Sequence, residues 1–276
     1  MFGYYGAKCR QSKWIDTFIP KDNNLYIEPF SGAFWVYFKM QHYPDQAVYN
    51  DFNPHMSNIF RCVSQDVRMF RELMEEIEPN NKEIFLKCRE DIFGKDASAL
   101  VIPNFGVALK YLYLVCHVWS GINPVSGSFV SRPSNQNKWS PLKKKLYDRK
   151  SWVPKINGIT NVHNDDFQKV IEQYDDGGAF FFVDPPYAGY ESDGKNSKIA
   201  YSLNGFSKKD HERLANTLKN IKGKFALTYY DFPELSKLYP KNEFKWEQKN
   251  YKVTAGSGHM KGKKLRESTE ILIMNY

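Results

Sequence analysis

The tetrapeptide Asp184-Pro185-Pro186-Tyr187 carries side chains suited to chemistry on an aromatic amine. It directly follows a continuous apolar run, 179–183, which is typical of a central strand buried on both faces. Ligands of open α/β sheets bind beyond the carboxyl ends of strands, so the tetrapeptide stands where a substrate would bind. The plainer alternative is a proline-containing turn at the end of a strand.

The chemistry of such an amine explains these residue types. Its lone pair is delocalised into the ring, which makes the nitrogen a poor nucleophile. The Asp184 carboxylate and the Pro185 carbonyl can accept its two N–H bonds and stabilise the positive charge that develops during reaction. The two prolines hold the loop rigid. Tyr187 offers a ring on which an extruded base can stack, since enzymes that modify bases take them out of the duplex.

A second pattern suited to ligand binding is the turn 28–33 (EPFSGA), between a short apolar run and a helical stretch at 33–40. Gly32 lets the backbone approach a ligand, and the start of the helix favours an anionic group. Asp51 stands 19 residues after Gly32, where an acid at the end of a second strand meets a ribose. The alternative is a tight strand–helix turn and an aspartate that caps a helix.

Alternating strands and helices must position these residues. The expected strands are 25–27, 47–49, 158–162, 179–183, 225–230 and 271–274. Asn53 resembles an N-cap with Pro54 at the first helical position, and this helix is predicted to extend to about Glu78. Ser207 to Asp210 resembles a capping box that opens a further helix. The rhythm is that of an α/β sheet with parallel strands.

Between about residues 61 and 150 the alternation stops. Helical patterns lead to a loop-rich stretch at 120–129 and then to a polar, basic run. That run contains Arg132, Asn135, Gln136, Asn137, Lys138, Lys143, Lys144, Lys145, Arg149 and Lys150. Its plainest interpretation is a solvated surface loop. The organisation is therefore an α/β core interrupted by a mixed, basic insert.

Composition describes an ordinary globular chain of 276 residues, with 42% hydrophobic and 25% charged residues. A formal charge of +8 favours an anionic partner such as nucleic acid or anionic lipid, or else indicates merely a basic enzyme. The four cysteines form no CxxC pair, so we expect neither a zinc site nor a disulfide framework, and a reducing, cytoplasmic location. The first residues do not resemble a signal peptide, and the longest apolar run, 105–119, is too short to span a membrane.

Taken together, these residues resemble the Dam-like, D12 class (alpha group) of N6-adenine-specific DNA methyltransferases along nearly the whole chain. The matching segments are 4–8 (YYGAK), 28–33, 50–53 (NDFN), 166–167, 184–187, 205–214 and 270–276. The resemblance implies S-adenosylmethionine as cofactor. The implied cofactor-binding residues are Tyr4, Lys8, Glu28, Phe30, Ser31, Gly32, Ala33, Asp51, Asp166 and Phe167. Among them Lys8 suits the methionine carboxylate, Asp51 the ribose, and Asp166 with Phe167 the adenine.

The resemblance also implies a fold and a mechanism. The expected fold is a Rossmann-like α/β core of the class I methyltransferases, a seven-stranded, mostly parallel sheet with a mainly helical target-recognition insert. The expected parts are 1–60 (cofactor half), 61–150 (insert) and 151–276 (second part of the core). Asp184, Pro185, Pro186 and Tyr187 would be catalytic. A flipped adenine would attack the methyl group in line and lose a proton to water, without a metal ion or a covalent enzyme intermediate.

We expect double-stranded DNA as partner, with the basic run holding phosphates and the preceding loop contacting base edges. The predicted DNA-binding residues are Asn123, Ser126, Ser128, Arg132, Asn135, Lys138, Lys143, Lys144 and Lys145. If the run is only solvated surface, the alternative track is Lys195, Lys198 and the segment 261–266. We further expect a monomer or weak dimer without membrane association, in the cytoplasm of a bacterial or phage-infected cell.

Two departures from the family pattern leave alternatives open. Phe34 stands where the family usually has a second glycine; it could narrow the cofactor pocket or point into the core, and we favour the core. The loop at 120–124 lacks the arginine that GATC-specific relatives often carry. A catalytically weak or inactive DNA-binding protein is therefore an alternative. An N4-cytosine enzyme more often has Ser, and an RNA enzyme Asn, where this chain has Asp184.

Overall fold

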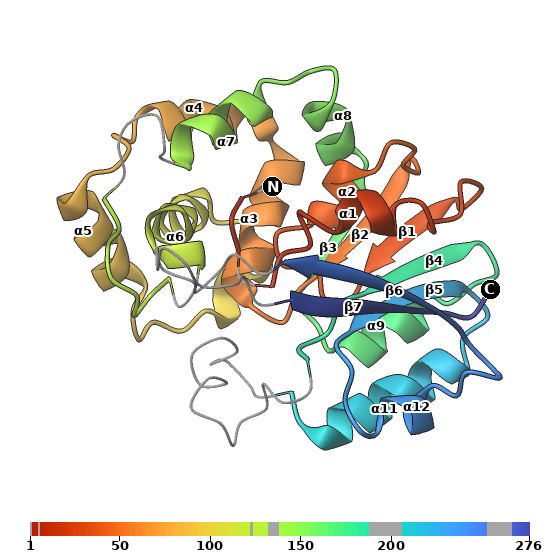
Figure 1. Cartoon of the computed structure of the whole chain (residues 1–276). Helices are drawn as coiled ribbons and strands as arrows, with labels where there is room; N and C mark the ends of the chain where they lie inside the picture. The colour runs from red at the N-terminus through yellow and green to blue at the C-terminus, as the bar shows by residue number, and fades with distance from the viewer. Residues whose placement is uncertain (1, 5, 122–123, 132–137, 188–205, 253–266) are drawn as a thin grey trace.

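The computed structural model describes residues 2–4, 6–121, 124–131, 138–187, 206–252 and 267–276 (Figure 1). Within these residues, seven strands form one sheet in the order β3-β2-β1-β4-β5-β7-β6. The strands are β1 (Leu25–Glu28), β2 (Gln46–Asn50), β3 (Ile159–His163), β4 (Ala179–Val183), β5 (Lys224–Tyr229), β6 (Lys245–Lys252) and β7 (Glu267–Met274). β3, β2, β1, β4 and β5 are parallel, and β7 runs antiparallel between β5 and β6. The expected seven-stranded, mostly parallel sheet is confirmed.

The order of the strands fixes where a ligand can bind. β1 lies between β2 and β4, so the chain moves to one side after β1 and later returns to its other side. Such a reversal leaves a crevice at the carboxyl ends of the two central strands. The turn 28–33 follows β1, Asp51 follows β2, and Asp184 follows β4. The three segments predicted to carry functional residues therefore meet at one edge of the sheet.

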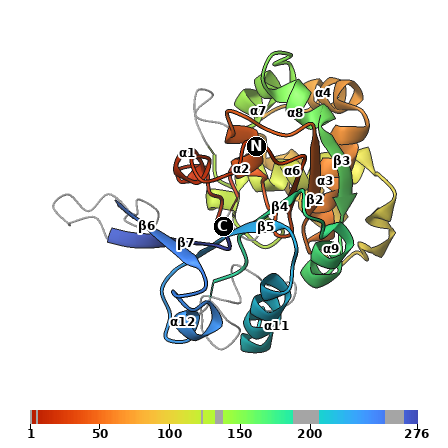
Figure 2. The ribbon, with the colours of Figure 1, turned by 90° about the vertical axis from the view of Figure 1, so that its right-hand side faces the viewer.

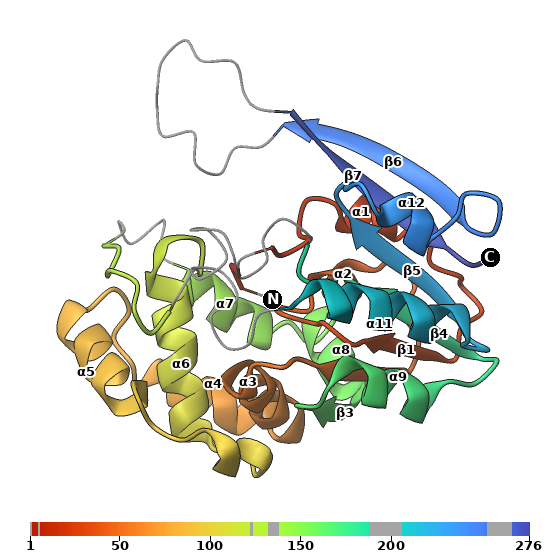
Figure 3. The same cartoon turned by 90° about the horizontal axis from the view of Figure 1, so that it is seen from below.

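Helices cover both faces of this sheet because successive side chains of its strands point to opposite faces. Tyr26 and Phe180 face one layer of helices, and Ile27 and Phe181 face the other. The first layer contains α1 (Ser12–Ile15), α2 (Trp35–Lys39), α3 (Pro54–Gln65) and α8 (Trp152–Asn157). The second contains α9 (Phe167–Tyr174), α11 (Lys208–Lys219) and α12 (Leu235–Leu238), and Figure 3 shows α9 and α11 lying along the sheet.

The segment between β2 and β3 extends beyond the sheet as a group of helices (Figure 1). After α3 come α4 (Val67–Glu75), α5 (Lys82–Ile92), η1 (Ser98–Val101), α6 (Phe105–His117), η2 (Trp119–Gly121) and α7 (Trp139–Leu146). Their buried side chains, including Phe70, Phe85 and Trp139, belong to the same hydrophobic cluster as Tyr49 of β2. The insert is thus helical, as expected, and shares its core with one face of the sheet.

Two elements differ from the sequence-based expectation. The helix predicted from Pro54 to about Glu78 ends at Gln65, because Asp66 has a non-helical backbone (φ −152°, ψ 89°) and its side chain accepts a hydrogen bond from the Met69 N–H, which starts α4. β6 was not anticipated; with β7 it extends beyond the rest of the sheet (Figure 2). The capping box of Ser207 and Asp210 is confirmed at the start of α11.

The cysteines carry free thiols: Cys9 is exposed, and Cys62, Cys88 and Cys116 are buried. No helix in the described part of the chain is long and apolar enough to cross a membrane. The same residues contain no group of three or more His, Cys, Asp or Glu side chains that could hold a metal ion.

Candidate active site

Asp184 directly follows β4, and its side chain is 16% exposed at the carboxyl edge of the sheet. Thr228 of the neighbouring β5 donates a hydrogen bond from Oγ1 to Asp184 Oδ1 at 2.8 Å. The ammonium of Lys8 lies 2.8 Å from the same oxygen. The carboxylate is therefore fixed by a hydroxyl and a cation at the end of a central strand, with one edge still reachable from solvent.

Glu270 completes this group from β7. The Lys8 ammonium lies 3.4 Å from Glu270 Oε1, and the Tyr187 hydroxyl donates a hydrogen bond to the same oxygen. Burial alone would lower the pKa of Lys8, but the carboxylates of Asp184 and Glu270 outweigh it and raise that pKa. Burial also raises the pKa of Glu270, and Lys8 opposes this shift. The sequence placed Glu270 only within a terminal family pattern and indicated no role for it.

Tyr187 is nearly buried, with 7% of its surface exposed. The rings of Tyr187 and Tyr230 meet edge to face with centroids 4.6 Å apart. The Lys8 ammonium lies 4.6 Å from the centroid of the Tyr187 ring. In this arrangement Lys8 covers part of the Tyr187 ring.

The turn after β1 is fixed by hydrogen bonds to the end of the neighbouring strand β2. Asn50 of β2 donates hydrogen bonds from its side chain to the carbonyls of Pro29, at 2.8 Å, and Asp165, at 3.1 Å. Gly32 has a positive φ of 49°, and a Cβ there would lie 3.2 Å from the Tyr4 ring. The structure thus brings Tyr4, Gly32 and the segment beside Asp166 to one place.

Asp51 lies beside this turn and binds it through the backbone. Its Oδ2 accepts the Gly32 N–H and its Oδ1 accepts the Asn53 N–H, both at 2.8 Å. Burial raises the pKa of Asp51 to about 6, although these two hydrogen bonds lower it. Each oxygen keeps a lone pair that can accept a further hydroxyl. The ring of Phe52, next in the chain, is 52% exposed.

Three other residues of the turn face inward. The Glu28 carboxylate is 2% exposed and accepts hydrogen bonds from the Tyr26 hydroxyl, at 2.5 Å, and the Tyr37 N–H, at 3.3 Å. Burial raises the pKa of Glu28 well above its ordinary value. Ser31 and Ala33 are also buried. These three side chains pack inside the protein and support the turn. Only the backbone of the turn is therefore available to a ligand at these positions.

Phe30 and Phe167 form an aromatic wall at the ends of β1 and β3. Their ring centroids lie 5.3 Å apart, and Phe206 packs edge to face on Phe30 at 5.7 Å. Asp166 caps α9 and binds Arg213 through both oxygens, at 2.6 and 2.8 Å. Arg213 was missed because nothing in its local sequence marks a partner 47 residues away.

Phe34 occupies the core, as favoured from the sequence. Its side chain is fully buried, and its ring stacks on Tyr37 with centroids 4.7 Å apart and packs against Tyr49 and Phe60. Its backbone is left-handed, with φ of 56°, a conformation that suits glycine. The ring therefore does not narrow the turn, and the sequence feature that favoured an inactive DNA-binding protein loses its force.

The predicted DNA-binding residues fall into different environments. Lys143 of α7 pairs with Glu75 of α4 at 2.5 Å. The Lys145 ammonium lies 4.8 Å and 4.7 Å from the rings of Trp35 and Trp152, and desolvation lowers its pKa. Lys144 is exposed. The structure therefore does not present the three lysines as one continuous basic surface.

The remaining predicted positions are only partly within the described residues. The Lys138 ammonium and the Gly121 backbone both lie against Gly3, so the first residues of the chain run beside this loop. Ser126 and Ser128 are exposed. Asn123, Arg132, Asn135 and Gln136 lie outside the described residues, as do Lys195, Lys198 and the segment 261–266.

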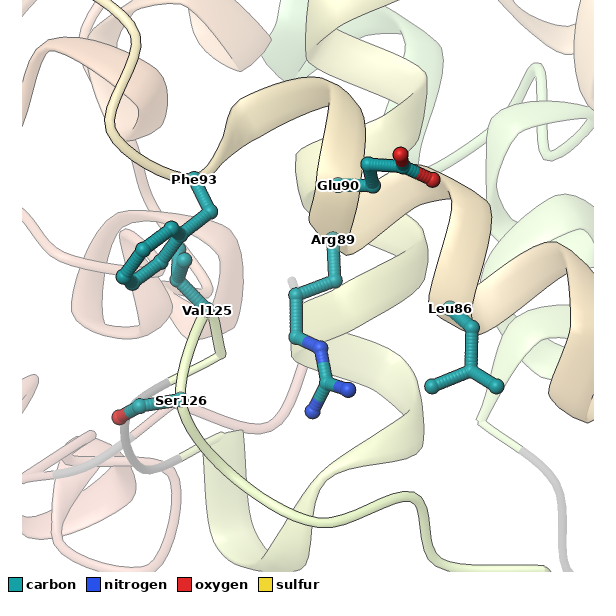
Figure 4. Close-up of a pocket in the computed structure, with 6 residues that line it drawn as sticks. All are labelled: Leu86, Arg89, Glu90, Phe93, Val125 and Ser126. Atoms are coloured by element: carbon teal, nitrogen blue, oxygen red, sulfur yellow. The ribbon is translucent and has the colours of Figure 1, made fainter.

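A shallow pocket of about 470 Å³ opens on the insert beside Ser126 (Figure 4). Val125 and Ser126 form one side, and α5 with the residue after it forms the other through Arg89 and Phe93. The Phe93 ring is 67% exposed. Nothing in the sequence singles out α5, because its acidic, basic and apolar residues are interspersed and form no basic cluster.

The strand order and the turn with Asp51 define an α/β methyltransferase core of class I, and the loop after β4 places a carboxylate at its open edge. Comparison with known proteins narrows this class. The family described as D12 class N6 adenine-specific DNA methyltransferase matches residues 4–255. The chain therefore belongs to this family.

Two relatives are similar along nearly their whole length. The type II methyltransferase M1.LlaDCHI of Lactococcus lactis subsp. cremoris is 26% identical over 277 residues, covering 98% of this chain and 93% of the relative. The type II methyltransferase M.CviBI of Paramecium bursaria Chlorella virus NC1A is 24% identical over 280 residues, covering 98% and 97%. The protein is an adenine-specific DNA methyltransferase, and DNA is its substrate.

Proposed function

We propose that this enzyme takes the methyl group from S-adenosylmethionine and transfers it to the N6 amine of an adenine flipped out of duplex DNA. The observation that carries the proposal is the position of Asp184. Its carboxylate follows the central strand β4, at the same edge of the sheet as Asp51 and the turn after β1. An amine acceptor and a candidate cofactor turn therefore adjoin the crevice between two central strands.

The chemistry of the residues at this turn fits the cofactor. Asp51 can accept ribose hydroxyls on the lone pairs that its two backbone hydrogen bonds leave. The exposed ring of Phe52 and the half-buried ring of Phe30, which packs on the buried Phe167, offer apolar faces to an adenine. S-Adenosylmethionine supplies a methyl group on positively charged sulfur. We assign direct contact to Gly32, Asp51 and Phe30, whereas the buried Glu28, Ser31, Ala33 and Phe167 support the site.

In the proposed mechanism the residues of this chain bind and orient the amine. The Asp184 carboxylate and the Pro185 carbonyl accept its two N–H bonds, and Pro186 keeps the loop rigid. The acceptors hold the nitrogen so that its lone pair points at the methyl group, which replaces a bimolecular encounter by a fixed geometry. Tyr187 stacks on the flipped base once Lys8 has moved from the ring. A proton then leaves N6 for water.

We assign target recognition to the insert, residues 61–150, and catalysis to residues 1–60 and 151–276. The insert projects from the sheet beside the N-terminal residues (Figure 1), where a duplex could contact both parts. Lys144 and Lys138 are the basic residues proposed to hold phosphates. Ser126, Ser128 and the pocket residues Arg89 and Phe93 are proposed to lie near the bases, together with Asn123, Arg132 and Asn135.

The test is to express the protein in cells that lack adenine methylation and to sequence their plasmid DNA for modified bases. We expect N6-methyladenine at one defined site, and none when Asp184→Ala is expressed at the same level. Purified Asp184→Ala should still bind DNA, because Asp184 acts on the amine and not on the phosphates. Methylation by this variant above about a tenth of the wild-type rate would contradict the assignment.

A further inference from the structure

A buried group of three charges surrounds the catalytic loop, and the mechanism proposed above gives a role in charge stabilisation to only one of them. One ammonium, of Lys8, faces two carboxylates, of Asp184 and Glu270, so the group carries a net charge of −1. The Glu270 side chain is fully buried on β7, two strands away from β4. A buried carboxylate is strongly unfavourable unless charges and hydrogen bonds compensate it.

The partners of Glu270 all belong to the surroundings of the catalytic loop. Oε1 is bound by the Lys8 ammonium and the Tyr187 hydroxyl, and Oε2 accepts the Tyr251 hydroxyl at 3.4 Å. The Tyr251 hydroxyl lies 2.7 Å from that of Tyr230, whose ring packs against Tyr187. A single carboxylate thus fixes the cation beside Asp184 and the ring proposed to receive the base.

We propose that Glu270 is a positioning residue for methyl transfer, which holds Lys8 and Tyr187 around Asp184 and keeps the buried group negative overall. The inference rests on the proposed roles of Asp184 and Tyr187. In this proposal Glu270 of β7 is a second carboxylate, besides Asp184, that stabilises the positive charge developing on the amine. It also gives the Tyr187 hydroxyl a purpose, since stacking by itself requires only a ring.

The charge balance of the reaction explains why a net negative group is useful. The N6 lone pair forms the new N–C bond, while the C–S bond of the methyl donor breaks and its electron pair stays on sulfur. Positive charge moves onto N6 until one N6 proton leaves for water. With Lys8 and Asp184 alone the group would be neutral; the charge of Glu270 makes it attractive to the developing cation in a site of low dielectric.

Glu270 also explains how the amine can reach Asp184. In the structure Lys8 and Thr228 both bind Asp184 Oδ1, which leaves little room on that oxygen for a third donor. The Lys8 ammonium is already 3.4 Å from Glu270, so it can exchange its bond to Asp184 for a closer one to Glu270. It stays paired with a carboxylate during the exchange, beside the Tyr187 hydroxyl that binds the same oxygen.

Glu270→Gln tests the proposal because it removes the charge and preserves the shape and one acceptor oxygen. At saturating DNA and methyl donor we expect kcat to fall by about 100-fold, with the Kd for DNA and the KM for the donor changed by less than about threefold. Glu267→Gln, an exposed change on the same strand, serves as the matched control and should retain wild-type kcat. Glu270→Asp should restore part of the loss.

The pH profile separates positioning from a merely structural effect. The groups that face Glu270 are Lys8, Asp184, Tyr187 and Tyr251. Because burial raises the pKa of Glu270, the wild-type kcat should fall on the acid side above the ordinary range of glutamate, and Glu270→Gln should move this limb to lower pH.

Three outcomes would overturn the inference: an unchanged kcat in Glu270→Gln, an unmoved acid limb, or a loss of DNA binding as large as the loss of kcat. Activity in Asp184→Ala would instead contradict the proposed function itself, so the two failures are distinguishable. A melting temperature measured for each variant shows whether it is folded.

Discussion

At the scale of single residues, Asp51 and Asp184 occupy equivalent places and have different surroundings. Each follows the last residues of a parallel strand at the same edge of the sheet. Asp184 is paired with the Lys8 ammonium, whereas Asp51 is bound by two backbone N–H groups. Burial outweighs these weaker partners, which is why the pKa of Asp51 rises to about 6. Its protonation therefore changes within a pH range in which the enzyme can be studied.

This pKa predicts opposite effects of pH on binding and on stability. Ionised Asp51 accepts hydroxyls best, so the affinity for S-adenosylmethionine should fall about tenfold from pH 7 to pH 5, with a midpoint near 6. The folded state binds more protons than the unfolded state between about pH 4 and 6, so Asp51 makes the free energy of unfolding decrease as pH rises through that window. Titration calorimetry and thermal melting measure the two trends.

Asp51→Asn supplies the control, because it keeps the shape and cannot ionise. Its affinity should be weaker than wild type at pH 7, by about 1–3 kcal/mol for the loss of a charge-assisted acceptor, and should not vary between pH 5 and 7. An Asn variant with the wild-type pH dependence would assign the titration to another group and remove Asp51 from the cofactor site.

Lys8 illustrates what a residue pattern can and cannot predict. The sequence located it in an N-terminal motif and, through the resemblance, assigned it to the carboxylate of the cofactor. The structure places its ammonium between Asp184 and Glu270, which lie 176 and 262 residues further along the chain. Motif spacing identifies such a residue as functional. Its partners depend on how distant strands are paired, and spacing does not contain that information.

At the scale of elements, α2 begins at an unusual residue. Phe34 is its N-cap, with a left-handed backbone and a fully buried ring. The left-handed conformation costs a non-glycine residue about 1–2 kcal/mol, whereas a buried phenylalanine ring contributes about 3–5 kcal/mol relative to alanine. Packing therefore outweighs the backbone cost, and the aromatic cluster around Tyr37, Tyr49 and Phe60 explains how the strained turn is tolerated.

Phe34→Gly should consequently destabilise the protein although it relieves the backbone. The difference between the two contributions predicts a loss of about 2 kcal/mol, or a decrease of about 5 °C in the melting temperature. The cofactor affinity measured well below that temperature should not improve. Phe93→Gly is a useful comparison because its ring is 67% exposed, and it should cost much less. A stable Phe34→Gly with tighter cofactor binding would instead mean that the ring crowds the pocket.

Most strands of the sheet were predictable, and the two departures, β6 and the helix break at Asp66, have separate physical causes. Apolar runs in the sequence predict the buried parallel strands, and Ala179–Val183 is the clearest of these runs. Within the described residues β6 (KWEQKNYK) lies at the edge of the sheet and pairs only with β7, so polar side chains are acceptable along it and no apolar run marks it. The break at Asp66 depends on one side-chain hydrogen bond, which the helical periodicity on either side conceals.

At the scale of the whole molecule, the three consecutive lysines of the basic run, Lys143, Lys144 and Lys145, do not contribute equally to the basic surface. Lys143 is neutralised by Glu75, and Lys145 packs between Trp35 and Trp152, where cation–π contact and burial of its stem stabilise the junction of α7 with the core. Lys144 alone of the three is exposed. Association with DNA should therefore depend on these residues unequally.

Measurements of DNA affinity at several salt concentrations should detect this inequality. Each lysine that meets a phosphate releases counterions and adds about 0.9 to the slope of log K against log salt. Lys144→Gln should therefore flatten the slope by about that amount and weaken binding to cognate and scrambled duplexes alike. Lys145→Gln should leave the slope nearly unchanged and lower the melting temperature, because its ammonium is engaged with two aromatic rings.

Lys237→Gln provides the matched control for this comparison. Lys237 is exposed on α12, on the side of the molecule away from the insert (Figure 1), so it has the same charge as Lys144 and a different place. If its loss flattens the salt slope as much as the loss of Lys144, the effect is one of net charge and not of contact. If neither change alters the slope, α7 is solvated surface and the phosphates are held elsewhere. A slope that responds to Lys144 alone would place the DNA backbone along α7 and orient the duplex across the insert.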